Sequence, residues 1–564
     1  MRTTAESPVL RARAIAGTYV VVLAWDVIDG QEDKLEGLLG FAIERTEYGD
    51  DGPVESYWMR SIKRFRDKDK GLPPGTPVST ADHPIQSFQW GDYTARAGAS
   101  YIYRIVPVFG IPKLLKLDDE AAVTVKVRME TEADPSPDSD QPLHDIYFNR
   151  GVVGSQAYAR EFGNADPDAD DPASREMVWL SRGLFEALRR FIGRARDERY
   201  ALRAALYEFH YQPVATAFAK AVEAGADVKI VYDAASPYEE ENVKTIERAG
   251  LDQLGAVIPR TVSEGLRHNK FIVLLEDGEP VAVWTGSTNI SPGGIFGHSN
   301  VGHVVWDRRT AAAFFEYWER LAENRTPSKL RPLNREATPT PDGKTPPNSV
   351  VPFFSARDEK DSVETLQWYA DRMAEAKEIA CITVAFNLDV VFQKVISQDN
   401  DVIRYIVKDD DLGEGEIIGH DRDVLFAAGA FLGKDALVNF LRERDNPLNS
   451  NNYIHTKFML VDPLSDDPLV VSGSANFSRP SQRSNDENML IIRGDTRVAD
   501  IYFGEYMRIF DHHYARYLVR KLKQEDKSDP NAGYLKENAD GWLPSHFNPK
   551  SYKAKRRKYF VGSN

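Results

Sequence analysis

The sequence predicts a multidomain protein in which an N-terminal all-β sandwich precedes two mixed-sheet α/β halves around a shared site. Three observations support this fold class. Residues 1–130 contain runs rich in Val, Ile, Tyr and Trp that turn residues separate. Beyond residue 142, helix-like and strand-like patterns alternate. One set of polar residues occurs there twice, which indicates an internal duplication.

The composition excludes several classes of protein. The chain has 564 residues, of which 42% are hydrophobic and 28% are charged, so it is neither disordered nor fibrous. The net charge of −15 argues against a general nucleic-acid coat, although a local basic groove remains compatible with it. The single cysteine, Cys381, excludes an internal disulfide and a cysteine-based zinc cluster.

The apolar run Tyr19–Trp25 is far shorter than the roughly 20 residues that cross a bilayer. It continues into Asp26 without a small-residue cleavage site, so it is typical of a strand and not of a secretory signal. We therefore expect no transmembrane segment and a cytoplasmic location, with secretion as the alternative.

Five strand-like runs define the N-terminal sandwich (1–130). Within them, Trp25, Tyr101 and Tyr103 lie where a fibronectin type III sandwich has a core Trp and a Tyr-x-Tyr strand, and the region resembles that family. Any other small β-sandwich is the broader alternative. The runs are Thr18–Val27, Leu38–Thr46, Ile85–Trp90, Ser100–Val108 and Ala121–Arg128.

Two stretches have the composition of linkers. Residues 131–142 are acidic and proline-rich, and residues 325–349 are rich in proline and polar residues. They delimit the halves at 143–324 and 350–524. The remaining residues, 525–564, form a basic tail with six positive charges in 550–560, which we expect to be solvated or to contact anionic lipid or nucleic acid.

Both halves have the same order of predicted elements, in which helix, strand, helix and strand precede two further strands. This alternation is typical of a layered α/β unit. The predicted elements are Leu180–Ala195, Tyr200–Phe209, Pro213–Ala224 and Asp227–Asp233 in the first half, and Val363–Ala376, Glu378–Phe386, Leu388–Ile396 and Val402–Lys408 in the second.

The duplicated set is His-x-Lys followed by Gly-Ser-x-Asn, and eighteen residues separate His from Gly in both copies. Residues i and i+2 of a strand share a face, so each His projects beside its Lys. Two imidazoles, two ammonium groups and neutral donors suit a phosphodiester. One His would attack phosphorus, the other would protonate the leaving oxygen, and no metal or cofactor is required. The residues are His268, Lys270, Ser287 and Asn289, and His455, Lys457, Ser474 and Asn476.

These motifs resemble the phospholipase D superfamily, whose signature is H-x-K-x4-D with a downstream G-S-x-N, over residues 145–520. The resemblance implies a covalent phosphohistidine that water or an alcohol then attacks. It further implies that His268 is the nucleophile and His455 the acid. Glu487 resembles the acidic residue that orients a signature His, and Asn300 occupies a similar place without a charge.

The first copy departs from this signature. Asp462 completes the second motif, but Leu275 stands at that position in the first. Both positions have opposite parity to their His and Lys, so a regular strand directs them away from the phosphate. We interpret the position as structural. A degenerate, weakened first half is the rival interpretation.

Other polar features have ordinary explanations. We expect His210, His298 and His303 in loops or at the surface, and His512 and His513 on the surface of an amphipathic helix. The acidic run 409–416 is typical of a solvated loop, with recognition of a cationic head group as the alternative. Phe426 and Phe431 fit a core helix.

Duplication within one chain and the acidic net charge favour hydrolysis of a phospholipid to phosphatidic acid and a head-group alcohol. The absent secretion signal and the basic tail favour the first alternative, a nuclease of the same superfamily. A catalytically dead scaffold is the second alternative. Both motifs lie in one chain, so a monomer suffices, and peripheral contact with a membrane is compatible with this substrate. An apolar rim would favour lipid, and a basic trough would favour nucleic acid.

Overall fold

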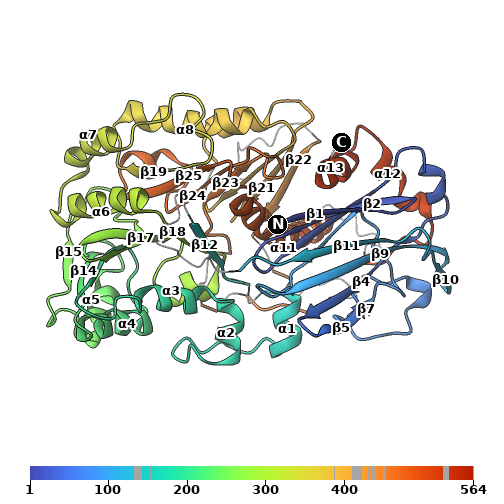
Figure 1. Cartoon of the computed structure of the whole chain (residues 1–564), viewed down its shortest axis with the longest axis horizontal. Helices are drawn as coiled ribbons and strands as arrows, with labels where there is room; N and C mark the ends of the chain where they lie inside the picture. Colours follow the sequence, from blue (N-terminus) through green and yellow to red (C-terminus); the bar gives the residue numbers. More distant parts are fainter. Residues whose placement is uncertain are drawn as a thin grey trace.

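The computed structural model describes residues 1–131, 143–152, 154–386, 388–409, 422–429, 431–432, 440–445, 447–448, 453–524 and 533–562. An N-terminal β-rich region lies at one end of the molecule, and two large mixed sheets lie side by side at the other (Figure 1). The predicted linker at 131–142 lies outside the described residues, apart from residue 131.

The N-terminal region is all-β, as predicted. Trp25, Tyr101 and Tyr103 are at most 1% exposed and belong to one core, and Asp92 accepts hydrogen bonds there from Arg45 and Tyr103. The fibronectin-like identity of this region stays a prediction. One sheet has the order β1 (Arg2–Glu6), β2 (Leu10–Ala16), β3 (Val21–Val27) and β8 (Gln89–Asp92). The other has β10 (Leu114–Leu117), β9 (Ser100–Ile111), β4 (Gly40–Gly49) and β5 (Gly52–Trp58), with β11 (Val123–Arg128) also on β9.

Short elements complete this region. They are β6 (Arg60–Ser61), which pairs with β7 (Val78–Ser79), and the 3-10 turns η1 (Glu32–Leu35) and η2 (Arg66–Lys68). The strands β1, β5 and β10 were not predicted, because they carry few buried apolar residues and lie at sheet edges, where the alternating pattern is weak.

The two large sheets have seven strands each and the same strand order. The first runs β12 (Leu143–Phe148), β18 (Val301–Trp306), β17 (Glu279–Gly286), β16 (Lys270–Glu276), β13 (Tyr200–Leu206), β14 (Asp227–Asp233) and β15 (Val257–Arg260). The second runs β19 (Ser349–Ser355), β25 (Glu487–Arg493), β24 (Leu469–Gly473), β23 (Phe458–Val461), β20 (Ile379–Val384), β21 (Ile403–Lys408) and β22 (Val424–Ala428). In each sheet, the last three strands of this order are parallel and the others pair antiparallel.

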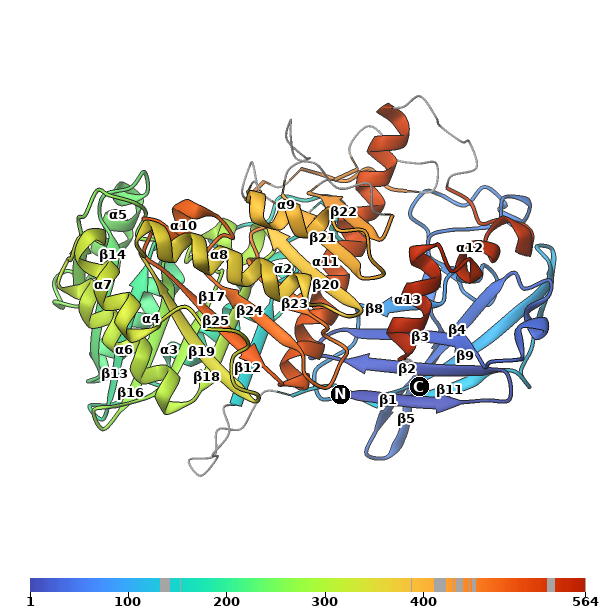
Figure 2. The same ribbon diagram turned by 90° about the horizontal axis from the view of Figure 1, so that it is seen from above.

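Helices form a central layer between the sheets and a layer outside each of them. The central layer contains α6 (Arg308–Ala322) and α11 (Thr496–Gln524), whose apolar side chains share one core with both sheets. In Figure 2, α11 extends from between the sheets toward the N-terminal region. The outer helices are α1 (Gln156–Phe162), α2 (Arg175–Ser181), α3 (Leu184–Ile192), α4 (Gln212–Glu223) and α5 (Glu239–Ala249) on the first half, and α8 (Glu359–Ala374), α9 (Val390–Ile396) and α10 (Arg479–Arg483) on the second.

Local sequence explains where the central and outer helices begin. The Asp307 carboxylate accepts the Thr310 backbone N–H at 2.8 Å and caps α6, and Asp358 caps α8 in the same way. Alternate residues of β16 point to different layers, so Phe271 faces the central core and Ile272 faces the outer one. This alternation fixes which side chains can reach the junction of the sheets.

The segment 325–349, predicted as a linker, contains the helix α7 (Pro327–Ala337). Pro327 occupies a first-turn position, where its missing N–H is tolerated. Leu330 is fully buried in the central core, and the Asn334 amide donates to the Ala356 carbonyl at 3.2 Å. The proline content that indicates a linker therefore marks a helix start.

The prediction of a solvated basic tail is wrong for residues 533–562. They form η4 (Ala539–Gly541), α12 (Pro544–Phe547) and α13 (Tyr552–Val561), which lie beside β2 and β3. Trp542 packs in the core of the N-terminal region and Phe560 in the central core. Arg557 pairs with buried Asp26, so this part of the basic segment is neutralised inside the fold.

Within the described ranges, no helix is both long enough and apolar enough to cross a membrane.

Candidate active site

The two polar sets meet where the two sheets face each other. His268 and Lys270 lie at the start of β16, and His455 and Lys457 directly precede β23. The His268 and His455 ring centroids are 6.5 Å apart at an interplanar angle of 67°. The structure therefore brings both copies into one site, as the sequence predicted.

Each Gly-Ser-x-Asn follows a strand that neighbours its His-x-Lys strand. Gly286 and Gly473 end β17 and β24, and neither position has room for a side chain. A Cβ atom would lie 2.2 Å from the Val301 carbonyl oxygen at Gly286 and 2.2 Å from the Asn488 oxygen at Gly473. Glycine thus permits the close strand approach that places the following Ser and Asn.

The histidines take their hydrogen-bond partners from the opposite halves. His268 Nδ1 is 2.9 Å from Glu487 Oε2, and His455 Nδ1 is 3.0 Å from Asn300 Oδ1. Asn300 donates its amide to the Gly294 carbonyl at 2.6 Å, so its oxygen faces His455. Each His must therefore donate from Nδ1, which leaves the Nε2 lone pair of the neutral ring available for chemistry.

Ser287 and Ser474 support these partners. Ser287 donates to Asn300 Oδ1 at 2.7 Å and Ser474 donates to Glu487 Oε2 at 2.7 Å, while both oxygens accept a backbone N–H from the next strand. A hydroxyl has one hydrogen, and here it is engaged. The expectation that these serines donate to an anionic substrate oxygen is therefore corrected to a supporting position.

Both lysines are buried, and no carboxylate of the described residues forms an ion pair with either of them. Lys270 Nζ and Lys457 Nζ each donate to the backbone carbonyl of their own motif His at 2.6 Å. Burial lowers the pKa of Lys270 to about 8. Burial and the neighbouring Lys270 hold the pKa of Lys457 well below its usual range. An anion between them would relieve this repulsion.

Burial also favours the neutral form of both imidazoles. It lowers the pKa of His268 to about 4, although the Glu487 carboxylate opposes the shift. The pKa of His455 lies well below its ordinary value because of burial and the charge of Lys457. A bound phosphate anion would raise both pKa values, so the substrate itself favours protonation of one ring.

The two motif asparagines lie in the same region. Asn289 is 1% exposed and Asn476 is 9% exposed. The Asn289 amide donates to Glu208. The oxygen of each side chain has no hydrogen-bond partner among the described residues. Both side chains therefore keep polar capacity for a ligand.

The structure adds site residues that the sequence did not indicate. The His298 ring lies 4.5 Å from that of His455 and is 3% exposed, so this residue lies in a loop, as predicted, but not at the surface. Tyr207 contacts the His268 ring at 4.9 Å, and the Lys270 ammonium lies 5.1 Å from the Tyr207 ring centroid. Glu208 follows Tyr207 in the chain. The sequence signal that could have indicated Tyr207 and Glu208 is their position directly after β13, the strand that pairs with the strand of the first His-x-Lys.

Asp462 and Leu275 lie away from the histidines, as strand parity predicted. The Asp462 carboxylate accepts the backbone N–H groups of Lys377, Glu378 and Ile379, at the end of β23 remote from Lys457. Leu275 is 4% exposed and packs in the central core. In this chain, both side chains stabilise the sheet.

Further expectations need correction. His303 is fully buried and joins a hydrogen-bonded chain through His144 and Tyr502. His513 is 1% exposed because α11 is buried on most sides. Phe426 lies in strand β22 and not in a helix. The acidic run 410–416 lies outside the described residues.

Within the described ranges, no group of three or more His, Cys, Asp or Glu side chains is arranged to hold a metal ion.

A family model described as "Cardiolipin synthase, PLD-like domain" matches residues 432–513, which include the second His-x-Lys and Gly-Ser-x-Asn. No curated protein matches the sequence.

Solved structures that match part of this chain include three proteins of low sequence identity and low TM-score. Phosphatidylserine synthase of Haemophilus influenzae Rd KW20 is 14% identical, with 61% of this chain and 91% of that chain covered at a TM-score of 0.41. Nuc, a phospholipase D family member from Salmonella typhimurium, is 20% identical. The match covers 33% of this chain and 96% of Nuc at a TM-score of 0.22. Yeast tyrosyl-DNA phosphodiesterase is 11% identical, and the match covers 55% of this chain and 87% of that chain at a TM-score of 0.32.

Proposed function

This chain belongs to the phospholipase D superfamily, and we propose that it cleaves a phosphodiester bond through a covalent phosphohistidine. One observation carries the proposal. Two imidazoles from different sheets are 6.5 Å apart, each is held through Nδ1, and two buried ammonium groups lie beside them. A nucleophile, an acid and a charge clamp are thus present in one site.

In the first step, the Nε2 lone pair of His268 attacks phosphorus and forms a P–N bond. The bond from phosphorus to the leaving oxygen breaks, and its electron pair goes to that oxygen. His455, protonated at Nε2 in the presence of the anionic substrate, gives this oxygen its proton. Lys270 and Lys457 stabilise the charge that develops on the other phosphoryl oxygens.

In the second step, water attacks phosphorus while neutral His455 Nε2 accepts its proton. The P–N bond breaks and its electron pair returns to His268 Nε2. An alcohol would follow the same route and give a new diester. The site is then restored without a net change in its protons.

The assignment of His268 as nucleophile is supported by its partner. Phosphorylation of Nε2 makes the ring cationic, and the Glu487 carboxylate at 2.9 Å stabilises a cation better than the neutral Asn300 amide does. His455, with the weaker partner, releases its proton more readily. The nucleophile and the acid are therefore distinguished by partners of different charge.

We propose a phospholipid as the substrate, which gives phosphatidic acid and a head-group alcohol. Leu266, two residues before His268, is 38% exposed, and Phe386, two residues after β20, is 56% exposed. Exposed apolar side chains near both halves of the site suit a lipid at a membrane surface.

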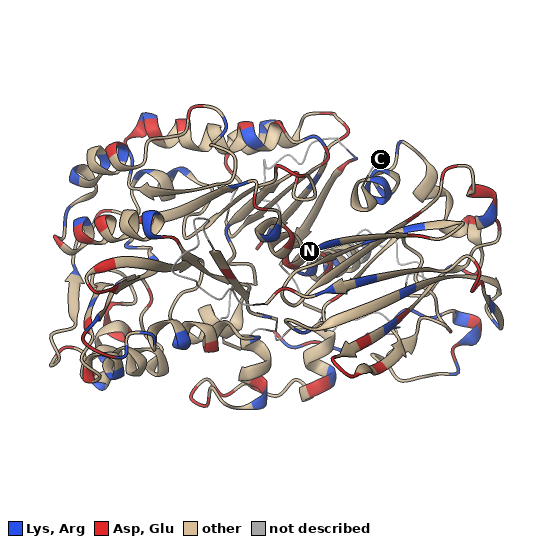
Figure 3. Ribbon diagram, viewed as in Figure 1, with Lys and Arg blue, Asp and Glu red and all other residues tan. Residues whose placement is uncertain are grey.

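Nucleic acid has less support. The basic tail that favoured it is folded as α13, with Arg557 and Lys555 paired to Asp26 and Asp423. Figure 3 shows positive and negative residues mixed along the outer helices α7 and α8. A continuous basic stripe along both halves would be needed to bind a strand.

A paired assay in EDTA tests the proposal. One reaction contains phosphatidylcholine and phosphatidylethanolamine vesicles and measures the free head group, and the other contains labelled single- and double-stranded DNA. We expect head-group release by the wild-type protein and none by His455→Ala, with a Lys360→Met surface variant as the matched control. DNA cleavage lost in His455→Ala would replace lipid by nucleic acid. Inactivity on both substrates, without a phosphohistidine after denaturation at alkaline pH, where the P–N bond is stable, would contradict catalysis.

A further inference from the structure

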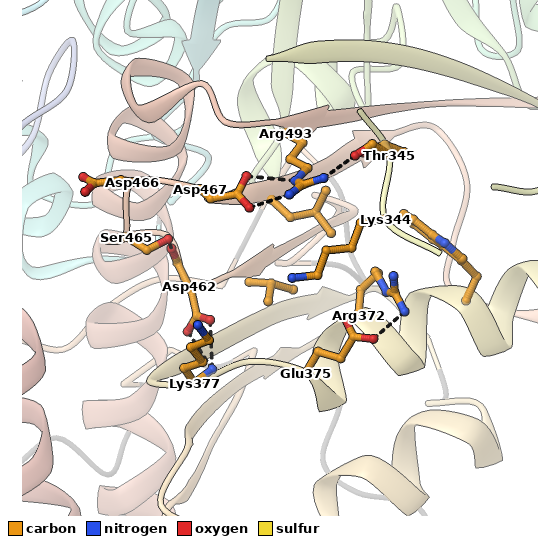
Figure 4. Close-up of a pocket in the computed structure, with 13 residues that line it drawn as sticks. Lys344, Thr345, Arg372, Glu375, Lys377, Asp462, Ser465, Asp466, Asp467 and Arg493 are labelled. Atoms are coloured by element: carbon orange, nitrogen blue, oxygen red, sulfur yellow. Dashed lines mark hydrogen bonds and ion pairs between the residues drawn. The ribbon is translucent and has the colours of Figure 1, made fainter. Parts of the chain in front are cut away.

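A pocket of about 290 Å³ lies in the second half, at the end of β23 remote from the histidines. Five residue steps of a strand, roughly 16 Å, separate Lys457 from Asp462 in its wall. Its other walls are the C-terminal part of α8, the segment after α7 and the end of β25 (Figure 4). The pocket is thus distinct from the site described above.

The charged residues in its walls are unequally paired. Arg493 forms two hydrogen bonds with Asp467, at 2.8 and 2.7 Å, and Arg372 bonds Glu375 at 2.6 Å. The Asp462 carboxylate is occupied by backbone N–H groups. Asp466 points away from the pocket in Figure 4.

Two ammonium groups remain in the walls. No carboxylate of the described residues lies within ion-pair distance of the Lys344 or Lys377 side chain. Figure 4 shows Lys344 reaching into the space between the Arg493–Asp467 pair and the Arg372–Glu375 pair. The lining contains four cationic and four carboxylate side chains, and the Lys344 ammonium is directed at the cavity (Figure 4).

Two buried polar atoms in the lining also lack a partner within the described ranges. Thr345 is 3% exposed, and its hydroxyl has no hydrogen-bond partner among the described residues. Arg372 is 9% exposed, and its Nε is likewise without one. A buried donor left unpaired is unfavourable, so such atoms mark a place where a ligand would add hydrogen bonds.

We propose that this pocket is a second anion site, which binds inorganic phosphate or the phosphate of a small monoester. Lys344 and Lys377 supply positive charge, and Thr345 Oγ and Arg372 Nε donate to phosphate oxygens. Trp368, Val461 and Leu469 form an apolar wall beside them, against which the organic part of a monoester packs. Binding here involves none of the residues assigned to catalysis.

Calorimetric titration of the full-length protein with inorganic phosphate at fixed ionic strength tests the proposal. We expect two sites per chain, because the paired histidines and lysines also attract phosphate. Lys457→Met removes one site and Lys344→Met removes the other, with affinity at the pocket weakened about tenfold or more. Lys360→Met, on the exposed face of α8, is the matched control and keeps both sites.

A second variant guards against misfolding of the first. Thr345→Val keeps the shape of the side chain and removes the hydroxyl, so phosphate and glycerol 3-phosphate should bind several-fold more weakly while the thermal unfolding midpoint is unchanged. A single phosphate site that is lost in Lys457→Met and kept in Lys344→Met would overturn the proposal. Equal affinity for acetate and phosphate at the pocket would overturn the assignment to phosphate.

Discussion

The two halves share strand order and signature spacing, yet they differ where their side chains meet. Glu487 of the second half holds His268, whereas Asn300 of the first half holds His455. Two residues before these partners, the second half has Asn485, which donates to Glu487, and the first half has His298, which lies against His455. Two sheets with the same strand order thus carry two histidines with chemically unequal partners, and the proposed mechanism gives them different roles.

The same contrast continues at the rim. Glu208 and Phe386 follow the corresponding strands β13 and β20 by two residues each. Glu208 accepts the Asn289 amide, whereas Phe386 is 56% exposed. Glu208 therefore gives the first half a polar side chain where the second half has the exposed aromatic ring of Phe386.

Removal of either histidine is the strongest test of the different roles proposed for His268 and His455. His268→Ala and His455→Ala should each lower phosphodiester hydrolysis by about 10³-fold or more, because each loses a nucleophile or a general acid. With a nitrophenyl ester, whose leaving group needs no proton, His455→Ala should still release one equivalent of nitrophenol and retain phosphorus on the protein. Rapid-quench kinetics measures both. A burst from His268→Ala in place of His455→Ala would reverse the roles.

Substitution of the hydrogen-bond partners of the two histidines, Glu487 and Asn300, should have the next largest effect. Glu487→Gln should lower kcat by about 10- to 100-fold, because a neutral amide stabilises the phosphorylated, cationic ring less well. Asn300→Asp places a carboxylate beside His455 and should raise the pKa of that ring. The basic limb of the pH profile, where protonated His455 is lost, would then move to higher pH. An unchanged limb would show that His455 does not act as the acid.

Substitution of His298 should have a smaller effect, which is a rise in the pKa of His455. Burial is the main cause of the low pKa of His455, and His298 covers this ring. His298→Ala should admit water and raise the pKa of His455, with a loss of activity of about fivefold, whereas His298→Phe keeps the cover. The pH titration of the His455 ring by NMR distinguishes the two variants. Equal pKa values in both would contradict a covering role.

The lowered pKa of His455 also predicts how the stability of the protein depends on pH. The pKa of folded His455 lies below its unfolded value near 6.5, so the unfolded chain takes up a proton that the folded chain refuses. The free energy of unfolding therefore falls as the pH drops below about 6.5. His298→Ala should make this fall less steep, which denaturant titrations at several pH values would measure. A steeper fall would contradict the assignment of the shift to burial.

The departure from the signature should affect stability and leave catalysis almost unchanged. Asp462→Leu removes an acceptor of three backbone N–H groups and should cost about 2–4 kcal/mol. Leu275→Asp buries an unpaired carboxylate in the central core and should cost at least as much. Activity per folded molecule should stay within about twofold in both variants. A hundredfold loss in folded Asp462→Leu would restore this position to the reaction.

Sequence alone predicted the features that depend on spacing. The repeated His, Lys, Ser and Asn gave both copies of the site, and alternation along β16 and β23 placed Leu275 and Asp462 away from it. The all-β region and its buried Trp25 followed from composition and pattern. That the two halves arose by duplication stays a prediction, although their strand orders agree.

The remaining features depend on how distant segments face each other. The resemblance predicted that Glu487 orients a signature His, but no local pattern shows that this His is His268, which lies 219 residues earlier in the chain. His298 was predicted in a loop or at the surface because an isolated histidine is most often found there, and its burial depends on the distant His455. The basic segment around Arg557 looked solvated because its partner, Asp26, lies near the opposite end of the sequence.

The packing of the C-terminal segment against the N-terminal region affects the order in which the protein folds during synthesis. Trp542, Leu543 and Phe547 pack in the core of the N-terminal sheets, but they are translated only after both large sheets. The core of the N-terminal region therefore stays incomplete and partly exposed to water while more than 400 further residues are translated. Nascent chains cut short in this interval would display that uncovered surface to chaperones and proteases.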